Sequence, residues 1–171
     1  MVVIEKASPK DADEIVALIN KVHETMEHQE WFVINSAEDY QKCLDGEHGV
    51  GFKAVDTETG RIAGVFTAVI PEDKETNLGY DVGFGKEDAD LCAIMDTAAI
   101  LPEYRGQNLQ YRTMMATEEY LKQKGYRYLL CTVHPENRFS LHNVLKQGYE
   151  IKDTKEKYGG YLRHVLLKEL E

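Results

Sequence analysis

Residues 98–110 read AAILPEYRGQNLQ and combine an apolar strand, a proline, a glycine-bearing turn and the start of a helix near Leu109. The first turn of a helix has backbone N–H groups without intrahelical partners, and the helix dipole is positive at that end. Gly106 would let an anion approach the main chain closely, so the segment predicts a phosphate-binding turn. An ordinary strand–turn–helix connection has the same pattern, and this segment alone leaves both interpretations open.

Two phrases in order resemble the acyl-CoA site of the GCN5-related N-acetyltransferase (GNAT) superfamily. The first phrase is residues 105–110, RGQNLQ, at the place of the family signature Arg/Gln-x-x-Gly-x-Gly/Ala, with LPEY directly before it. The second phrase follows after one expected helix and one expected strand, and consists of Asn137, Ser140, Gly148 and Tyr149. The resemblance is firm over residues 91–149.

The resemblance implies a binding site for acetyl-CoA as co-substrate. Main-chain groups of the strand that ends at Ile100, Ala98 included, would pair with the pantetheine arm. The turn would hold the pyrophosphate through Arg105, Gly106, Gln107, Asn108, Leu109 and Gln110. Asn137 and Ser140 match positions that meet the far part of the CoA arm, although a helix cap and a solvated hydroxyl would also account for them.

The chain departs from the family pattern at three positions. Asn108 and Gln110 stand where the family has Gly and Gly or Ala. Asn tolerates a left-handed backbone better than most residues, so Asn108 can keep the turn. Val144 stands where many members have the Tyr that protonates the departing thiolate, so that acid is missing from its usual place.

Asp96 is the most conspicuous candidate for a catalytic base. It interrupts a run of apolar residues, where we expect a buried strand, and desolvation would raise its pKa. The alternative is that Asp96 anchors neighbouring groups. His134, at the end of the next expected strand, and Tyr161 or Tyr158, in the terminal hairpin, are candidates for the missing acid; each of them also has a purely structural interpretation.

Composition narrows the class of protein. The formal net charge of −10 argues against nucleic acid as a partner and is compatible with a cationic amine acceptor. No apolar run approaches the ~20 residues that span a bilayer, and the N-terminus does not resemble a signal peptide. Three cysteines far apart fit buried thiols in a reducing cytoplasm, and no cysteine or histidine cluster has metal-ligand spacing, so we expect no metal.

The apolar patterns predict one mixed α/β three-layer domain over residues 1–171. The resemblance implies a GNAT-like α-β-α arrangement with a mixed, largely antiparallel sheet. Expected strands are 2–7, 49–56, 62–70, 91–101, 126–133, 149–157 and 161–167. Helices are expected from Pro9, from 36 to about 44, at 109–124 and at 137–148. The segment 71–90 is aperiodic and is predicted to be a functional loop.

We therefore predict a cytoplasmic N-acetyltransferase that transfers an acetyl group from acetyl-CoA to a primary amine by direct attack on the thioester. The alternative is a non-catalytic CoA-binding sensor on the same fold, which the valine at position 144 favours. The acceptor, a small molecule or a peptide amine, is not encoded in these patterns. A homodimer is common on this fold, but no self-complementary patch points to one.

Overall fold

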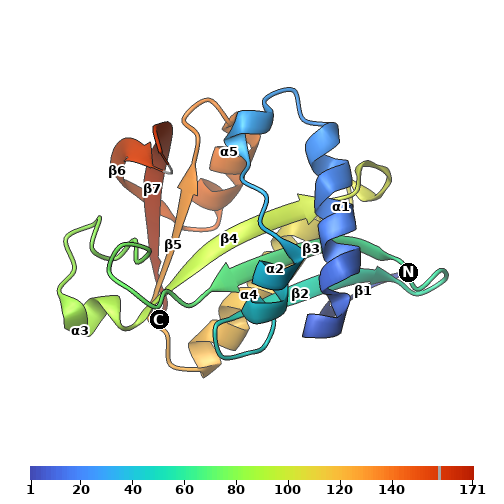
Figure 1. The fold of residues 1–171 in the computed structure, drawn as a ribbon, viewed down its shortest axis with the longest axis horizontal. Coiled ribbons are helices and arrows are strands. Elements are labelled where there is room, and N and C mark those ends of the chain that lie inside the picture. Colours follow the sequence, from blue (N-terminus) through green and yellow to red (C-terminus); the bar gives the residue numbers. More distant parts are fainter. Residues whose placement is uncertain (158) are drawn as a thin grey trace. The chain divides into compact units, whose positions relative to one another are not determined.

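The computed structural model describes residues 1–157 and 159–171 (Figure 1). The contacts of the chain divide it into two compact units. Unit 1 comprises Met1–Val69 and Asp96–Tyr120. Unit 2 comprises Ile70–Met95 and Leu121–Glu171. One strand, β4 (Cys92–Ile100), begins in unit 2 and ends in unit 1. The expectation of a single domain stays a prediction.

Hydrogen bonds connect seven strands of the described residues in the order β1-β2-β3-β4-β5-β7-β6. Parallel pairing joins β4 to β5, whereas β1 with β2, β2 with β3, β5 with β7 and β6 with β7 are antiparallel. The predicted mixed, largely antiparallel sheet is confirmed. The other strands are β1 (Val2–Lys6), β2 (Gly49–Asp56), β3 (Ile62–Val69), β5 (Tyr128–Val133), β6 (Glu150–Lys157) and β7 (Tyr161–Glu169).

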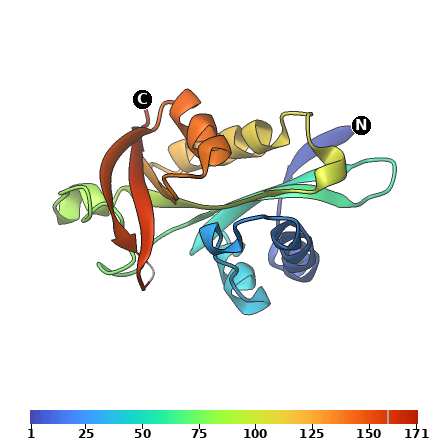
Figure 2. The same cartoon turned by 90° about the horizontal axis from the view of Figure 1, so that it is seen from above.

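Unit 1 has helices on both faces of its strands (Figure 2). Apolar residues of α1 (Ala12–Glu24), among them Ile15 and Ile19, pack with Val65, Ala99 and Leu101. Leu109, at the start of α4 (Leu109–Gln123), packs instead with Ala54 and Ala63. Because neighbouring strand residues point to opposite faces, the pairs Ala99 and Ile100, or Ile62 and Ala63, contribute to both layers. This arrangement is the predicted α-β-α layering.

Local signals in the sequence account for the helix and hairpin boundaries of unit 1. The short helix α2 (Ala37–Cys43) begins at Ser36, whose hydroxyl accepts a hydrogen bond from the Asp39 N–H at 3.1 Å while the Asp39 carboxylate accepts from the Ser36 N–H. Gly60 turns the chain from β2 into β3 with a positive φ of 74°, which glycine adopts without strain. A 3-10 turn, η1 (Pro9–Asp11), precedes α1.

In unit 2, β7 lies between β5 and β6. The pairing of Val133 with His164 and of Lys157 with Tyr161 sets the register. Helix α5 (Arg138–Lys146) precedes this hairpin. The segment after β3, predicted to be aperiodic, contains the four-residue helix α3 (Lys86–Ala89), which is too short to show a helical period in the sequence.

Hydrogen bonds of its own hold the segment around α3 in place. The buried Asn77 side chain donates to the Ala89 carbonyl at 2.9 Å and accepts from the Gly79 N–H at 2.9 Å. The Asp81 carboxylate forms ion pairs with Lys155, at 3.2 Å, and Lys157, at 2.8 Å. The segment is therefore tied to β6 of the same unit.

The burial of β4 differs from the expectation. Ala93, Met95, Thr97 and Ala99 are buried, whereas Ile94, Ala98 and Ile100 are half-buried and Asp96 is exposed. The prediction of a strand buried on both faces is therefore wrong, because continuous apolarity conceals a two-residue alternation in exposure. The three cysteines are buried free thiols, and within the described residues no helix has the length and apolarity of a membrane span.

Candidate active site

The predicted phosphate-binding turn adopts the backbone expected of it. After β4 and a 3-10 turn, η3 (Pro102–Tyr104), Gly106 has a φ of 87° and Asn108 a φ of 61°. Asn108 is the one non-glycine residue with positive φ among those the structure describes, and Asn is among the residue types that tolerate that region. Space is open where a Cβ would stand on Gly106. The substitution of the family glycine by Asn108 thus preserves the turn.

Backbone donors at this turn are available for an anion. The first hydrogen bond into α4 runs from the Arg112 N–H to the Asn108 carbonyl at 3.0 Å. Within the described residues, none of the N–H groups of residues 106–110 donates a hydrogen bond. These groups stand at the positive end of a helix of fifteen residues, which favours a negatively charged group.

The side chains of the turn differ in exposure. Arg105, Gln107 and Asn108 are exposed, Gln110 is half-buried, and Leu109 is buried in the core below α4. Leu109 therefore anchors the start of the helix through its side chain and offers only its backbone N–H to a ligand. Arg105 has its guanidinium in solvent, where a charge-assisted contact to an anion would be available.

Ala98 and Ile100 lie on the part of β4 beyond its pairing with β5. The parallel register joins Cys92, Ala93 and Ile94 to β5, and β4 continues for six more residues. Ala98 and Ile100 are half-buried, on the same side of the strand as Asp96 by the two-residue period. The side of β4 that leads to the turn is thus the accessible one.

Asp96 belongs to a small polar network in unit 1. Its Oδ2 atom accepts hydrogen bonds from Asn35 Nδ2 at 3.4 Å and from Thr97 Oγ1 at 3.2 Å. The Tyr40 hydroxyl lies 3.2 Å from Thr97 Oγ1. The protein around Asp96 desolvates the carboxylate and raises its pKa, against the opposing effect of the Thr97 hydrogen bond. The expected burial of Asp96 is wrong, since the side chain is exposed, but the expected direction of the pKa shift is confirmed.

Sequence reasoning missed Asn35 and Thr97 as partners of Asp96, and Tyr40 as a partner of Thr97. Asn35 is 61 residues away along the chain, so no local pattern connects it to Asp96. From the sequence, Tyr40 could belong to an aromatic wall over the acceptor or to a hydrophobic staple, and neither interpretation uses its hydroxyl. The available clue was its position four residues after the Ser36 cap, on the buried side of α2.

Asn137 and Ser140, in unit 2, are joined by one hydrogen bond. The Asn137 side-chain oxygen accepts from the Ser140 N–H at 3.3 Å and caps α5. Capping accounts for this carbonyl oxygen, while the Asn137 amide nitrogen and the Ser140 hydroxyl remain groups that could meet a ligand. A binding role for either residue stays a prediction.

His134 and Tyr161, also in unit 2, differ in how they are held. His134 Nδ1 accepts a hydrogen bond from the Glu136 N–H at 3.1 Å, so the proton of the neutral ring is on Nε2. Tyr161 lies at the exposed start of β7. The Arg163 guanidinium carbon stands over the Tyr161 ring, 5.3 Å from the ring centroid. Tyr158 lies outside the described residues. Val144 is buried.

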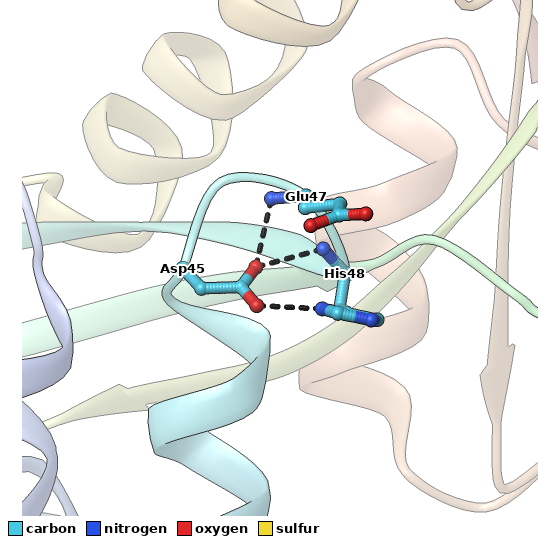
Figure 3. Close-up of side chains that lie close together, drawn as sticks. All are labelled: Asp45, Glu47 and His48. Carbon is cyan, nitrogen blue, oxygen red and sulfur yellow. Dashed lines mark hydrogen bonds and ion pairs between the residues drawn. The ribbon is translucent and has the colours of Figure 1, made fainter.

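One cluster of potential metal ligands was not anticipated from residue spacing. The ligand atoms of Asp45, Glu47 and His48 lie within 4.8 Å of one another, in the turn between α2 and β2 (Figure 3). Asp45 accepts hydrogen bonds from the His48 N–H at 2.8 Å and the Glu47 N–H at 2.7 Å and contacts the His48 ring. The His48 N–H, followed by the ring and Glu47, lowers the pKa of Asp45 to about 2. These contacts account for the cluster as a turn stabiliser.

Comparisons with known proteins agree with the motifs. The model of the acetyltransferase (GNAT) family matches residues 13–149. The fold is similar to that of a GNAT-family acetyltransferase from Streptococcus pneumoniae, with 19% identity, a TM-score of 0.74 and full coverage of both chains. No curated protein sequence matches this chain.

Two further solved structures have the same fold. The ribosomal-protein-S18-alanine N-acetyltransferase from Escherichia coli has 14% identity and a TM-score of 0.73, over 99% of this chain and 94% of that one. The PaiA N-acetyltransferase from Thermoplasma acidophilum, solved in complex with coenzyme A, has 15% identity and a TM-score of 0.71, over 99% of both chains. At these identities the likeness establishes the fold.

Proposed function

Because the chain belongs to the acetyltransferase (GNAT) family, we propose that it transfers the acetyl group of acetyl-CoA to a primary amine. The observation that carries the proposal is the turn before α4. Five consecutive N–H groups, of residues 106–110, are without partners in the described chain at a helix N-terminus, and the backbone conformation of Gly106 and Asn108 presents them there. A pyrophosphate would satisfy them.

The residues at this turn fit acetyl-CoA. In the proposal, the N–H groups from Gly106 to Gln110 hold the pyrophosphate, and Arg105 adds a charged contact. Main-chain groups of Ala98 and Ile100 pair with the pantetheine arm, while Asn137 and Ser140 meet its far part. The similar fold solved with coenzyme A supports this assignment.

Proton transfer is assigned to three side chains. Acetyl-CoA would supply the thioester carbonyl that the amine nitrogen attacks. Asp96 accepts the proton released by the amine, a role that its raised pKa suits, and His134 or Tyr161 donates a proton to the departing thiolate. The neutral His134 ring would donate its Nε2 proton, and Tyr161 would donate the proton of its hydroxyl.

A second function, a non-catalytic CoA-binding sensor, has one observation in its favour. Val144 occupies the position at which many family members have an acidic Tyr, and its side chain is buried and cannot move a proton. We still favour an enzyme over a sensor, because the CoA thiolate is a good leaving group. General acid catalysis contributes about 10²–10⁴-fold, so its loss slows such an enzyme without abolishing turnover.

The acceptor that we propose is a primary amine, either a small molecule or a peptide. Two of the similar structures are named as ribosomal-protein alanine N-acetyltransferases, and at 14–16% identity these names do not transfer an acceptor to this chain. We include a cytoplasmic location in the proposal, consistent with three free thiols.

Calorimetry and a free-thiol assay together test this function. Titration of the protein with CoA should show binding, and acetyl-CoA with a panel of small and peptide amines should release free thiol in an amine-dependent way. Absence of CoA binding at millimolar ligand would refute both the enzyme and the sensor. Tight CoA binding without turnover of any amine would favour the sensor.

A further inference from the structure

The Asp96 carboxylate is held through one of its two oxygens. Asn35 Nδ2 and Thr97 Oγ1 both donate to Oδ2, at 3.4 Å and 3.2 Å. No hydrogen bond to Oδ1 exists among the described residues, and the Asp96 side chain is exposed. The two oxygens of this carboxylate are therefore chemically different.

The direction of the hydrogen bonds follows from counting protons. The Thr97 hydroxyl has one proton, which it gives to Asp96, so at the 3.2 Å contact with Tyr40 it accepts. Tyr40 keeps its proton at neutral pH, because burial raises the pKa of Tyr40 to about 12. The chain of donors thus runs from Tyr40 to Thr97 to Asp96, and Asn35 joins it from a second side. Donors in such a chain strengthen one another.

We propose that Asn35 and Thr97 are positioning residues that fix the Asp96 carboxylate through Oδ2 and leave Oδ1 to accept the proton of the acceptor amine. The inference rests on the proposed function and deepens it, since it names the atom that meets the amine. Tyr40 orients the Thr97 hydroxyl through the hydrogen bond between them. The side chains of Tyr40 and Thr97 are both almost fully buried.

The electrostatic surroundings make Asp96 sensitive to these two donors. The titratable groups that respond to its charge are Tyr40 and Cys43, both on α2, and desolvation followed by the Asp96 charge raises the pKa of Cys43 to about 12. Both groups are neutral at physiological pH and offer no countercharge. Desolvation favours the protonated acid, and the two donors favour the carboxylate. Removal of either donor should therefore raise the pKa of Asp96.

A carbon-13 NMR titration of the Asp96 carboxyl group measures this directly in the protein without ligands. Asn35→Ala and Thr97→Val should each move the Asp96 midpoint upward by about half a unit to one unit. Thr97→Ser keeps the hydroxyl and should restore the wild-type midpoint. Matched controls are Asn20→Ala, an exposed asparagine on α1, and Thr67→Val, a buried threonine on β3 whose hydroxyl has no hydrogen-bond partner among the described residues. Neither control should move the midpoint.

Kinetics connect the midpoint to turnover. The acidic limb of kcat/KM for amine acetylation should move to higher pH in Asn35→Ala and Thr97→Val, by the same amount as the NMR midpoint. An unmoved midpoint in both variants would overturn the positioning role, even with normal wild-type turnover. A moved midpoint with no amine-dependent thiol release in the wild type would instead overturn the proposed function, and with it the catalytic purpose of the network.

Discussion

At the scale of single residues, Asp96 combines solvent exposure with a raised pKa. The side chain is exposed, so an acceptor amine can reach it, while the surrounding protein still desolvates it. Burial raises the pKa of Tyr40 and of Cys43, and the nearby Asp96 charge raises both further. A group that is reachable and yet easily protonated is suited to take up a proton and release it again.

Asp96→Asn is expected to lower the acetylation rate by about 10²–10⁴-fold with CoA affinity nearly unchanged. In the wild type, the rate should fall as the pH falls through the raised pKa of Asp96, because the protonated acid cannot accept a proton. Rates over pH 4–9 and calorimetry with CoA measure these effects.

Asp96→Asn should lower the acetylation rate without lowering the stability of the fold. The pKa of Asp96 is raised by folding, so its contribution to stability is full below the unfolded pKa and is lost as the pH rises through the folded value. At neutral pH the carboxylate opposes folding, and Asp96→Asn should leave the melting temperature unchanged or raise it. An unaltered rate together with a large drop in melting temperature would assign Asp96 a structural role.

Val144 raises a different question, namely whether the family Tyr could be restored here. Its side chain is 5% exposed, and its carbonyl accepts hydrogen bonds from Gln147 and Tyr149 at the end of α5. A tyrosine ring at this position must displace packed neighbours. Val144→Tyr is expected to reduce the free energy of unfolding by about 1–3 kcal/mol, measured by urea denaturation.

The adjacent position supplies the control. Leu145 is 42% exposed on the same helix, so Leu145→Tyr should change the free energy of unfolding little. If Val144→Tyr proved as stable as wild type and accelerated turnover, the residue would face the thioester, and the acid would be restored at its family position.

At the scale of elements, the shape of the turn between β4 and α4 depends on the backbone conformation of two residues. Gly106 and Asn108 have positive φ. The sequence predicted a glycine turn at Gly106 and a left-handed backbone at Asn108, because few residue types tolerate that region. The helix start at Leu109 followed from the same segment. What the segment could not reveal was that Leu109 is buried and contributes only its N–H, since burial depends on β2 and β3, distant in the chain.

Gly106→Ala is expected to weaken CoA binding, because an L-residue in the left-handed region costs about 1–2 kcal/mol and the turn would relax away from it. Gly60→Ala is the matched control. Gly60 also has a positive φ, of 74°, with open space around it, and lies in the hairpin between β2 and β3. Both variants should lose similar stability, but only Gly106→Ala should lose CoA affinity by calorimetry. Equal affinities would remove the turn from the binding site.

Sequence patterns predicted most element boundaries within a few residues, because caps and turns are local. Ser36, Gly60 and Asn137 each form hydrogen bonds with residues three or four positions away. The alternating exposure of β4 was missed, since a half-buried Ala98 and a buried Ala99 read alike as apolar letters. The Asp96 network was missed because Asn35 is far from Asp96 along the chain and contacts it only in the folded protein.

At the scale of the whole molecule, family membership defines the cofactor chemistry more closely than the acceptor. The family model covers residues 13–149 and does not extend over the terminal hairpin of β6 and β7. Of the similar folds at 14–19% identity, two are named for a ribosomal-protein alanine acceptor, and such identities establish the fold alone. The acceptor must therefore be sought in properties of this chain itself, of which the net charge is the most general.

The net charge of −10 leads to the last prediction. A negative field attracts a cationic amine and repels the polyanionic CoA, and salt screens both effects over a Debye length of about 8–10 Å. Raising the salt concentration should therefore raise KM for a cationic acceptor and lower KM for acetyl-CoA. Steady-state kinetics between 20 mM and 500 mM salt, at fixed pH, would measure both constants. A zwitterionic amine should show little change in KM, and a cationic acceptor whose KM is independent of salt would mean that the acidic surface serves solubility alone.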